Sequence, residues 1–384
     1  MRIGMFTDNY FPKINGVATS VLMLKKNLEA IGHDVYIITT TDPDAVKPEH
    51  NVIRIPSVPV KKQRLGIAIN PAIYHYIRKL SLDIIHTHTE FTIGNVGKIM
   101  AKYLNKPAVH TMHTIYEYYS SYIISAQLFE PLINAITRKL TVVFCNGADT
   151  VIVPSSKTLS IIRDYGVRKP IRVIPTGIPL DRFAAEHYDA KKIAALRSEL
   201  GIKEHNKVLI NIGRVSHEKN LDKLMESLQG YMRIHPHVIL LIVGDGPARK
   251  ELEKLAEDLG IRTQVIFAGS RPWEDIHLYY RVGDIFIGAS ESETQGLTYI
   301  EAMASGRPVV AKEDACLNDI LINDENGYLF NDAEKLTSAV DKLLSDAEMH
   351  KRFAAKAVVS VQRFSAESYA RSVSDVYEKL AANR

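Results

Sequence analysis

The 384-residue sequence lacks several features that mark specialised classes of protein. Its two cysteines, Cys145 and Cys316, lie far apart and form no motif, so a disulfide framework is not expected and a reducing, cytoplasmic location fits best. The first residues predict a β-strand and contain no long apolar run of the kind found in secretory signals. No stretch approaches the roughly 18 to 20 uninterrupted apolar residues that a transmembrane helix needs. Integral insertion into a membrane is therefore not expected.

Composition is equally unspecialised. The net charge is +4, with 46% hydrophobic and 24% charged residues, values that are typical of a soluble globular protein. The sequence has no short repeat and no low-complexity tract, and we expect no nucleic-acid partner. A chain of this length suits two α/β domains better than one.

Short apolar runs alternate with helical patterns in both halves, which is typical of parallel sheets joined by helical crossovers. Val17–Ile31 has one apolar helical face, and Gly32 follows it as a helix-ending residue. The second half repeats the alternation after a connecting segment, at about 175–203, that contains proline, glycine and a charged helix. We therefore predict an α/β fold with two doubly wound domains. The predicted strands are Arg2–Thr7, Val35–Thr39, Val52–Ile55, Asp83–Thr87, Ala108–Met112, Thr150–Val153, Arg172–Ile174, Lys207–Ile212, Val238–Val243, Gln264–Phe267, Asp284–Ile287 and Pro308–Ala311, and further helices are predicted at Leu221–Arg233, Ala248–Leu259, Tyr299–Ala304 and about Ala366–Leu380.

Two strand ends carry residues suited to binding an anion or a ligand backbone. Gly213–Asn220 follows one predicted strand and contains Arg214 and Lys219 near the start of a helix. Helix amides and cationic side chains favour negative charge there, and a diphosphate is the natural candidate. The alternative is a solvated turn. At the next strand end Gly244 allows close approach of a ligand or another loop, although a plain tight turn explains it equally.

The segment Glu291–Val310 places two carboxylates near a third strand end. Glu293 lies in a polar loop and Glu301 on the helix that follows. Ionised carboxylates accept hydrogen bonds from sugar hydroxyls. The alternative is that Glu301 forms a cap or an ion pair and that Glu293 is solvated.

The sequence at this point resembles a known family. Glu293–Glu301 is similar to the E-x7-E motif of retaining nucleotide-sugar glycosyltransferases of the GT-B fold, glycosyltransferase family 4. Three further elements match in order along the chain: the glycine-bearing loop Pro12–Val17, a histidine after a first-domain strand at His113, and the Arg214 and Lys219 pair. Together these matches spread over most of the chain.

The resemblance implies a role for each matched residue. His113, Glu293, Arg214 and Lys219 are expected to be catalytic, with the two cations neutralising the diphosphate as it leaves. His113 is expected to contact the transferred sugar, Glu293 to hold its hydroxyls, and Glu301 to hold the ribose. The expected donor-binding residues are Gly16, Arg214, Lys219, Gly244, Arg271, Glu293, Gly296, Leu297 and Glu301, with Arg271 in the loop that lines the base pocket.

The family also implies the domain layout and the stereochemistry. In the GT-B fold the C-terminal helix returns to the first domain, so we expect an acceptor-binding domain at 1–175 plus about 365–384. The nucleotide-sugar-binding domain is expected at 176–364. A helix packed only on the second domain is the alternative. Retention of the α configuration through a front-face mechanism is expected by analogy.

Histidines at two strand ends raise the question of a metal. His86 and His88 form one pair, and His110 and His113 form another, and such clusters can bind metal ions. Apart from Glu90, however, acidic ligands are absent nearby. With Arg214 and Lys219 available for the phosphates, we expect no metal and no cofactor beyond a nucleotide-sugar co-substrate, with UDP-glucose as the expected donor.

The expected acceptor is a membrane lipid. The variant Ser292–Glu301 looks like the motif of bacterial diacylglycerol glucosyltransferases, and Tyr10–Ser20 is also similar to theirs. Basic residues precede an apolar stretch at 65–76, a combination suited to an anionic membrane surface, and we expect a peripheral location on the inner face of the cell membrane. The residues expected at the acceptor or membrane are Lys61, Lys62, Arg64 and Tyr116.

Alternatives to that acceptor remain open. The stretch that begins at residue 65 also fits an ordinary helix that starts at Asn70–Pro71 and turns four side chains towards the core, Ile73, Tyr76, Ile77 and Leu80. A soluble sugar or phosphoinositol acceptor, GDP-mannose as donor, and a non-catalytic two-lobed binding protein are further possibilities. Oligomeric state is not visible in the sequence.

Overall fold

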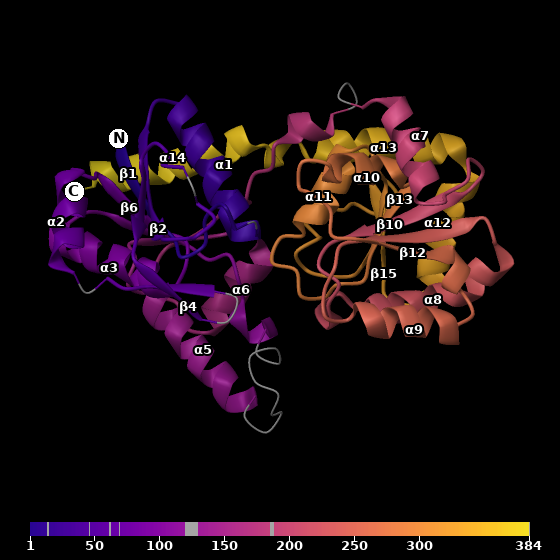
Figure 1. The fold of residues 1–384 in the computed structure, drawn as a ribbon, viewed down its shortest axis with the longest axis horizontal. Helices are drawn as coiled ribbons and strands as arrows, with labels where there is room; N and C mark the ends of the chain where they lie inside the picture. Colours follow the sequence, from indigo (N-terminus) through magenta and orange to yellow (C-terminus); the bar gives the residue numbers. More distant parts are fainter. Residues whose placement is uncertain are drawn as a thin grey trace. The chain divides into compact units, whose positions relative to one another are not determined.

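The computed structural model describes residues 1–13, 15–45, 47–60, 63–68, 70–119, 130–184 and 188–383. The chain divides into two compact units (Figure 1). Unit 1 comprises Met1–Ile178 together with Ser365–Arg384, and unit 2 comprises Pro179–Phe364. Each unit is an α/β structure built on one parallel sheet, so the predicted fold class is confirmed.

Unit 1 has a seven-stranded sheet in the order β3-β2-β1-β6-β7-β8-β9, and every neighbouring pair is parallel. The strand order reverses direction between β1 and β6, which are hydrogen-bonded neighbours. Ligands of such sheets bind beyond the carboxyl ends of the strands at this switch point. The strands are β1 (Arg2–Phe6), β2 (Asp34–Thr40), β3 (Val52–Ile55), β6 (Ile84–Thr87), β7 (Ala108–Thr111), β8 (Thr150–Val153) and β9 (Ile171–Val173).

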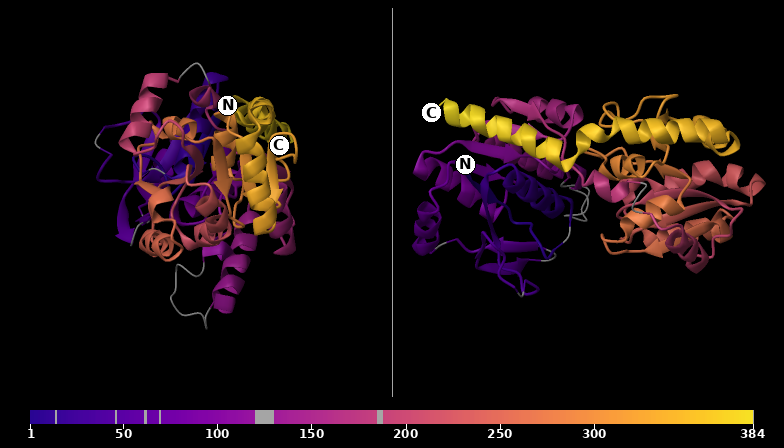
Figure 2. Two further views of the ribbon diagram at one scale, coloured as in Figure 1. Left: turned by 90° about the vertical axis from the view of Figure 1, so that its right-hand side faces the viewer. Right: turned by 90° about the horizontal axis from the view of Figure 1, so that it is seen from above.

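Helices cover both faces of this sheet. In α1 (Gly16–Ala30) the side chain of Asn15 accepts a hydrogen bond from the amide of Ala18, so the helix begins with a standard N-cap. The last helix, α14 (Ala366–Ala382), returns to unit 1 and lies beside α1 (Figures 1 and 2). Its apolar residues belong to the same buried core as those of α1 and β1. The other helices of unit 1 are α2 (Pro71–Lys79), α3 (Thr92–Leu104), α5 (Glu130–Cys145) and α6 (Ser156–Asp164).

Unit 2 has a six-stranded parallel sheet in the order β12-β11-β10-β13-β14-β15. Its switch point lies between β10 and β13. The central strand β11 is a run of six buried apolar residues, as expected for a strand covered on both faces. The strands are β10 (Lys207–Ile212), β11 (Val238–Val243), β12 (Val265–Gly269), β13 (Ile285–Gly288), β14 (Val309–Lys312) and β15 (Gly327–Phe330), and the helices are α7 (Ala190–Glu199), α8 (Leu221–Ile234), α9 (Arg249–Asp258), α10 (Ile276–Val282), α11 (Leu297–Ala304), α12 (Ala333–Ser345) and α13 (Ala347–Ser360).

Every strand that the sequence predicts is present, with bounds that shift by one or two residues. Three strands were missed. The edge strand β15 has four residues, and the apolar run just before it, Ile320–Ile322, lies in the loop and not in a strand. The other two, β4 (Ser57–Val60) and β5 (Gln63–Gly66), form an antiparallel hairpin outside the main sheet. Val58 and Val60 in the hairpin are exposed, so it does not show the buried run that predicts a core strand.

Candidate active site

The loops after β10 and β11 in unit 2 are in direct contact. Gly213 has φ of +156° and Gly244 has φ of +138°, conformations that favour glycine. A Cβ added at Gly244 would lie 1.8 Å from the carbonyl oxygen of Gly213, and one at Gly246 would lie 2.1 Å from that of Val215. The structure therefore assigns Gly244 to loop-on-loop packing, one of the interpretations that the sequence left open.

An ion pair joins the two sides of the switch point. Lys219 follows β10 in a short 3-10 turn, His217–Lys219, and Glu293 lies in the loop after β13. The Lys219 Nζ lies 2.5 Å from Glu293 Oε1, and both side chains are largely buried. Glu293 is therefore not a solvated side chain. Arg214 is exposed in the same loop as Lys219.

A second contact that sequence analysis missed holds these two loops together. Asn220 precedes α8 in a left-handed conformation, with φ of +49°. Its amide nitrogen donates to the carbonyl of Ala289 at 3.1 Å and to the Glu291 carboxylate at 3.2 Å. An asparagine before a helix usually predicts a cap, but this side chain makes no cap hydrogen bond and instead crosses to the loop that carries Glu293.

The loop after β13 ends at the start of α11. Gly296 has φ of +76° and precedes Leu297, the first residue of α11. A Cβ at Gly296 would lie 2.9 Å from the Tyr299 ring, so both conformation and space favour glycine here. The backbone amides in the first turn of α11 have no acceptor within the helix, and they lie at the positive end of the helix dipole.

Glu301 lies one turn further along α11. It accepts a hydrogen bond of 2.6 Å from the hydroxyl of Tyr280, on α10. Desolvation by burial raises the pKa of Glu301 to about 7, although the Tyr280 hydrogen bond and the charge of Arg182 act in the opposite direction. Neither Tyr280 nor Arg182 was predicted, because no motif links residues so distant in sequence.

Arg271 and Arg182 lie in the neighbouring part of unit 2. Arg271 lies 4.0 Å from Glu199 and over the ring of Tyr279. Arg182 stacks on Trp273, 3.7 Å from the ring centroid, and donates to the Trp273 carbonyl at 2.6 Å. These planar groups are suited to lining a pocket for a flat base.

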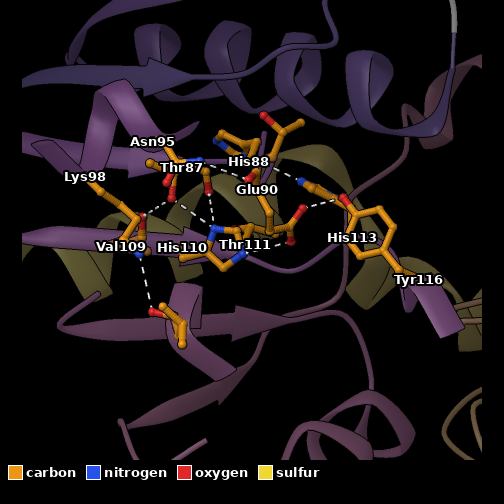
Figure 3. Close-up of polar contacts among 12 residues, drawn as sticks. Thr87, His88, Glu90, Asn95, Lys98, Val109, His110, Thr111, His113 and Tyr116 are labelled. Atoms are coloured by element: carbon orange, nitrogen blue, oxygen red, sulfur yellow. Dashed lines mark hydrogen bonds and ion pairs between the residues drawn. The ribbon is translucent and has the colours of Figure 1, made fainter. Parts of the chain in front are cut away.

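In unit 1 a polar cluster gathers at the ends of β6 and β7, next to the switch point (Figure 3). Glu90 is central. One carboxylate oxygen lies 3.1 Å from His110 Nε2, and the other accepts a hydrogen bond from the Tyr116 hydroxyl. The other ring nitrogen of His110, Nδ1, lies 2.9 Å from the hydroxyl and 3.1 Å from the carbonyl oxygen of Thr87. Figure 3 shows Tyr116 turned towards Glu90.

His113 is half-buried beside this cluster. Its Nε2 lies 3.1 Å from Nδ1 of His88, and the two rings stack. Desolvation lowers the pKa of His113 to about 4, against a smaller raising effect of Glu90. Burial also lowers the pKa of His88. Both rings are therefore neutral at physiological pH and are suited to hydrogen bonding rather than to charge stabilisation.

The contacts of His86 indicate that its role is structural. Its ring is fully buried, with Nδ1 at 2.6 Å from the Tyr377 hydroxyl of α14 and Nε2 at 2.7 Å from the Thr111 hydroxyl. Within the described residues, no group of three or more His, Cys, Asp or Glu side chains is arranged to hold a metal ion.

Asp8 anchors the loop after β1. Its carboxylate accepts hydrogen bonds from the hydroxyls of Thr89 and Thr92, at 2.6 and 2.5 Å, and from the amide of Ile93. Gly16 opens α1 nearby in sequence, and a Cβ there would meet no atom within 4 Å. Open space at Gly16 leaves room for a ligand.

The residues expected at the acceptor or the membrane have separate positions. Lys61 and Lys62 lie outside the described residues. Arg64 folds back on its own hairpin and donates to the hydroxyl and carbonyl of Ser57, at 2.9 and 3.1 Å. The alternative interpretation of this helix holds for three of its four residues, because Ile77 is buried and Ile73 and Leu80 pack against the same core. Tyr76 is 53% exposed, so its predicted place in the core is wrong.

Comparisons with known proteins agree with this architecture. Residues 14–182 match the family model described as Glycosyltransferase Family 4, and residues 192–359 match Glycosyl transferases group 1. The chain is 38% identical to the alpha-monoglucosyldiacylglycerol synthase of Streptococcus pneumoniae over 98% of this chain and 85% of that protein. It is 33% identical to the synthase of the same name from Acholeplasma laidlawii, over 99% and 97% of the two chains.

A solved structure shares the whole fold. Alr3699/HepE of Anabaena, crystallised in complex with UDP, superposes with a TM-score of 0.79 at 21% identity, covering 99% of this chain and 100% of that one. This likeness confirms the GT-B fold. Within the described residues, no helix has the length and apolar character needed to cross a bilayer. Taken with the matched family models and the near full-length identity, these findings show that the chain belongs to glycosyltransferase family 4 and is a glycosyltransferase.

Proposed function

We propose that this enzyme transfers glucose from UDP-glucose to the free hydroxyl of 1,2-diacylglycerol and yields α-monoglucosyldiacylglycerol. The observation that carries the proposal is the near full-length identity, 38% and 33%, to two alpha-monoglucosyldiacylglycerol synthases. We assign the substrate-binding roles of the two parts of the chain by resemblance to the GT-B family. Residues 1–175 with 365–384 bind the acceptor, and residues 176–364 bind the nucleotide sugar.

The reaction exchanges one bond at the anomeric carbon for another. The bond between C1 of glucose and the β-phosphate oxygen breaks, and a bond between C1 and the acceptor oxygen forms on the same face. The acceptor proton passes to the departing phosphate oxygen, so charge and protons balance. Retention of the α configuration follows from this front-face geometry.

Unit 2 stabilises the negative charge of the leaving group. Arg214 and Lys219 meet the diphosphate as its charge grows, and the amides of Gly296 and Leu297 add the positive end of a helix dipole. The proposed reaction uses no metal ion. The Lys219–Glu293 ion pair supports this assignment, because it brings the phosphate-binding cation to within 2.5 Å of the carboxylate assigned to the sugar hydroxyls.

Contacts to the sugar and the nucleoside complete the donor site. Glu293 holds hexose hydroxyls, Glu301 holds the ribose, and Arg271 lies at the base. His113 contacts the transferred sugar as a neutral hydrogen-bonding group, in line with its lowered pKa. Gly16, with open space beside it, lets the loop after β1 approach the donor phosphates.

A donor and acceptor screen tests the proposal. Radiolabelled UDP-glucose and GDP-mannose are each incubated with detergent-dispersed diacylglycerol or with soluble inositol phosphate, and label is counted in the organic phase and in purified products. We expect lipid-soluble label from UDP-glucose and diacylglycerol alone. Transfer only to the soluble acceptor, or only from GDP-mannose, would contradict it.

Because diacylglycerol lies in membranes, the proposed enzyme binds peripherally to the anionic inner face of the cell membrane. Flotation with anionic vesicles measures that contact, and a protein that stays in the aqueous fraction would contradict it.

A further inference from the structure

Exposed apolar side chains are distributed unevenly over the chain. Among the described residues, fifteen large apolar side chains are exposed, and twelve of them belong to unit 1. Scattered single residues of this kind are ordinary, but a concentration marks an interaction surface. Eleven of the twelve lie on the β4–β5 hairpin or directly after it, on α2, immediately before or within α3, or on α5: Val58, Val60, Ile67, Tyr76, Phe91, Ile99, Tyr103, Leu132, Ile136, Leu140 and Val143.

Helix α5 shows the concentration most clearly. Leu132, Ile136, Leu140 and Val143 are 60, 50, 61 and 60% exposed. Their spacing of four, four and three residues puts them in one stripe along the helix. An amphipathic helix normally turns such a stripe to the core, whereas this one turns it outwards.

The elements concerned adjoin one another. Lys98 of α3 donates to the carbonyl of Val143 on α5 at 3.3 Å and lies over the Phe144 ring. The hydroxyl of Tyr103 on α3 accepts a hydrogen bond of 3.4 Å from Arg78 of α2. A groove of about 750 Å³ opens between β5 and α3, with Leu65, Ile67, Tyr74, Phe91, Val96 and Ile99 among its lining residues.

Charge on these elements is predominantly positive, although α5 begins with Glu130. Residues 63–68, 70–79, 91–106 and 131–145 contain eight lysines and arginines and no aspartate or glutamate, while the whole chain has 48 basic and 44 acidic residues. Acidic neighbours exist beyond these segments, since Glu117 pairs with Arg138. A basic surface with outward apolar side chains matches an anionic lipid surface in both charge and polarity.

We propose that β4–β5, α2, α3 and α5 form one docking face for an anionic lipid bilayer, and that the apolar stripe of α5 enters its acyl region. The cations contact lipid headgroups, and the groove beside α3 opens towards the acyl chains. The proposal rests on the proposed function only in that a lipid acceptor gives the enzyme reason to bind a membrane.

Vesicle binding of matched variants tests the docking face. Ile136→Ser with Leu140→Ser removes two exposed apolar groups of α5. The matched control is Ile234→Ser with Val359→Ser, on unit 2, where both side chains are more than 70% exposed. Partition into phosphatidylglycerol vesicles should weaken about ten-fold or more for the α5 variant, since two large apolar side chains leave the bilayer. The control should stay within about two-fold of the parent. Equal partition of the α5 variant and the parent would overturn the proposal.

Charge reversal supplies an independent arm. Lys102→Glu with Lys139→Glu, on α3 and α5, is compared with Lys223→Glu with Lys250→Glu on unit 2, which changes the net charge equally. Binding to phosphatidylglycerol vesicles should fall roughly five-fold for each charge lost from the docking face, with little change for the control pair. An equal loss in both pairs would mean that only net charge matters and would overturn the assigned face.

Two further readouts separate this proposal from its rivals. Sedimentation of the parent and the α5 variant reports self-association, and a parent dimer that the variant abolishes would assign the face to a second copy and overturn the lipid proposal. Glucose transfer to a short-chain diacylglycerol in nonionic detergent should survive in the α5 variant. If the parent transfers no glucose, the proposed function fails while the vesicle result still stands or falls separately.

Discussion

The ion pair between Lys219 and Glu293 joins two residues that a motif analysis assigns separately. Sequence matching identified each of them, but their contact depends on the neighbouring positions of β10 and β13 in the sheet, which no local pattern specifies. The same is true of Tyr280 and Arg182 beneath Glu301. Residue types and motif spacing therefore selected the side chains that we assign to the donor site, whereas the contacts that they make with partners such as Tyr280 became visible only in the fold.

Replacement of either partner of the ion pair should cost activity more than stability. Lys219→Ala and Glu293→Ala should each lower kcat at least about 100-fold, because one removes a charge that stabilises the leaving group and the other removes the carboxylate that accepts from the sugar hydroxyls. Lys351→Ala, which breaks an exposed ion pair with Glu348 in unit 2, is the matched control and should leave turnover unchanged. Steady-state kinetics with UDP-glucose measures all three. Turnover near the parent level in either site variant would contradict the assignment.

Glu301 should make stability depend on pH. Its pKa of about 7 exceeds the ordinary value of 4.5, so the folded state holds the proton more tightly than the unfolded state. The resulting penalty is absent below about pH 4.5, grows as pH rises to 7 and is constant above that. Glu301→Gln lacks the penalty and keeps an acceptor for Tyr280. Its unfolding free energy relative to the parent should rise between pH 5 and pH 8, by at most roughly 3 kcal/mol. Urea titrations measure this, and a difference that does not depend on pH would contradict it.

At the scale of elements, strands with buried apolar runs were predicted with nearly correct bounds. Two kinds of element escaped prediction for physical reasons. β15 is an edge strand whose place is set by close packing, since a Cβ at Gly327 would lie 2.4 Å from the Val309 carbonyl oxygen. The outward stripe of α5 has helical spacing that is typical of a core-facing helix, so periodicity alone assigns it to the wrong environment.

The C-terminal helix α14 should stabilise unit 1 through a polar contact as well as through its apolar face. The Tyr377 hydroxyl lies 2.6 Å from Nδ1 of the buried His86. Tyr377→Phe leaves that nitrogen without its partner and should lower the free energy of unfolding by about 1 to 3 kcal/mol. Tyr76→Phe, on an exposed ring of unit 1, should change it by less than about 0.5 kcal/mol. Denaturant unfolding followed by circular dichroism compares the two, and equal effects would contradict the structural role given to Tyr377.

At the scale of the whole molecule, buried histidines should make unit 1 the more acid-sensitive part. Burial lowers the pKa of four histidines in unit 1, His33, His86, His88 and His113, and of His277 in unit 2. In the unfolded chain these histidines bind protons as pH falls below about 6.5, whereas in the folded chain they stay neutral. The folded state therefore loses stability as pH falls below that value. Each such group contributes at most about 1.4 kcal/mol per pH unit, and four of these five histidines lie in unit 1.

The single tryptophan allows the two units to be followed separately. Trp273 lies in unit 2, so its fluorescence reports that unit, while circular dichroism reports both. Between pH 7.5 and pH 5.5 the urea midpoint measured by circular dichroism should fall more than the midpoint measured by fluorescence. A larger shift in the fluorescence midpoint would contradict this account.

The central claim is a retaining transfer of glucose to a lipid alcohol at a site whose cations hold the departing diphosphate. The anomeric configuration of the purified lipid product tests it most directly. After reaction of UDP-glucose with diacylglycerol, the proton NMR signal of the anomeric position should show the small coupling of an α-glucoside, and this product should be lost in Lys219→Ala. A β-glucoside, or no glucolipid at all from the folded enzyme, would contradict the claim.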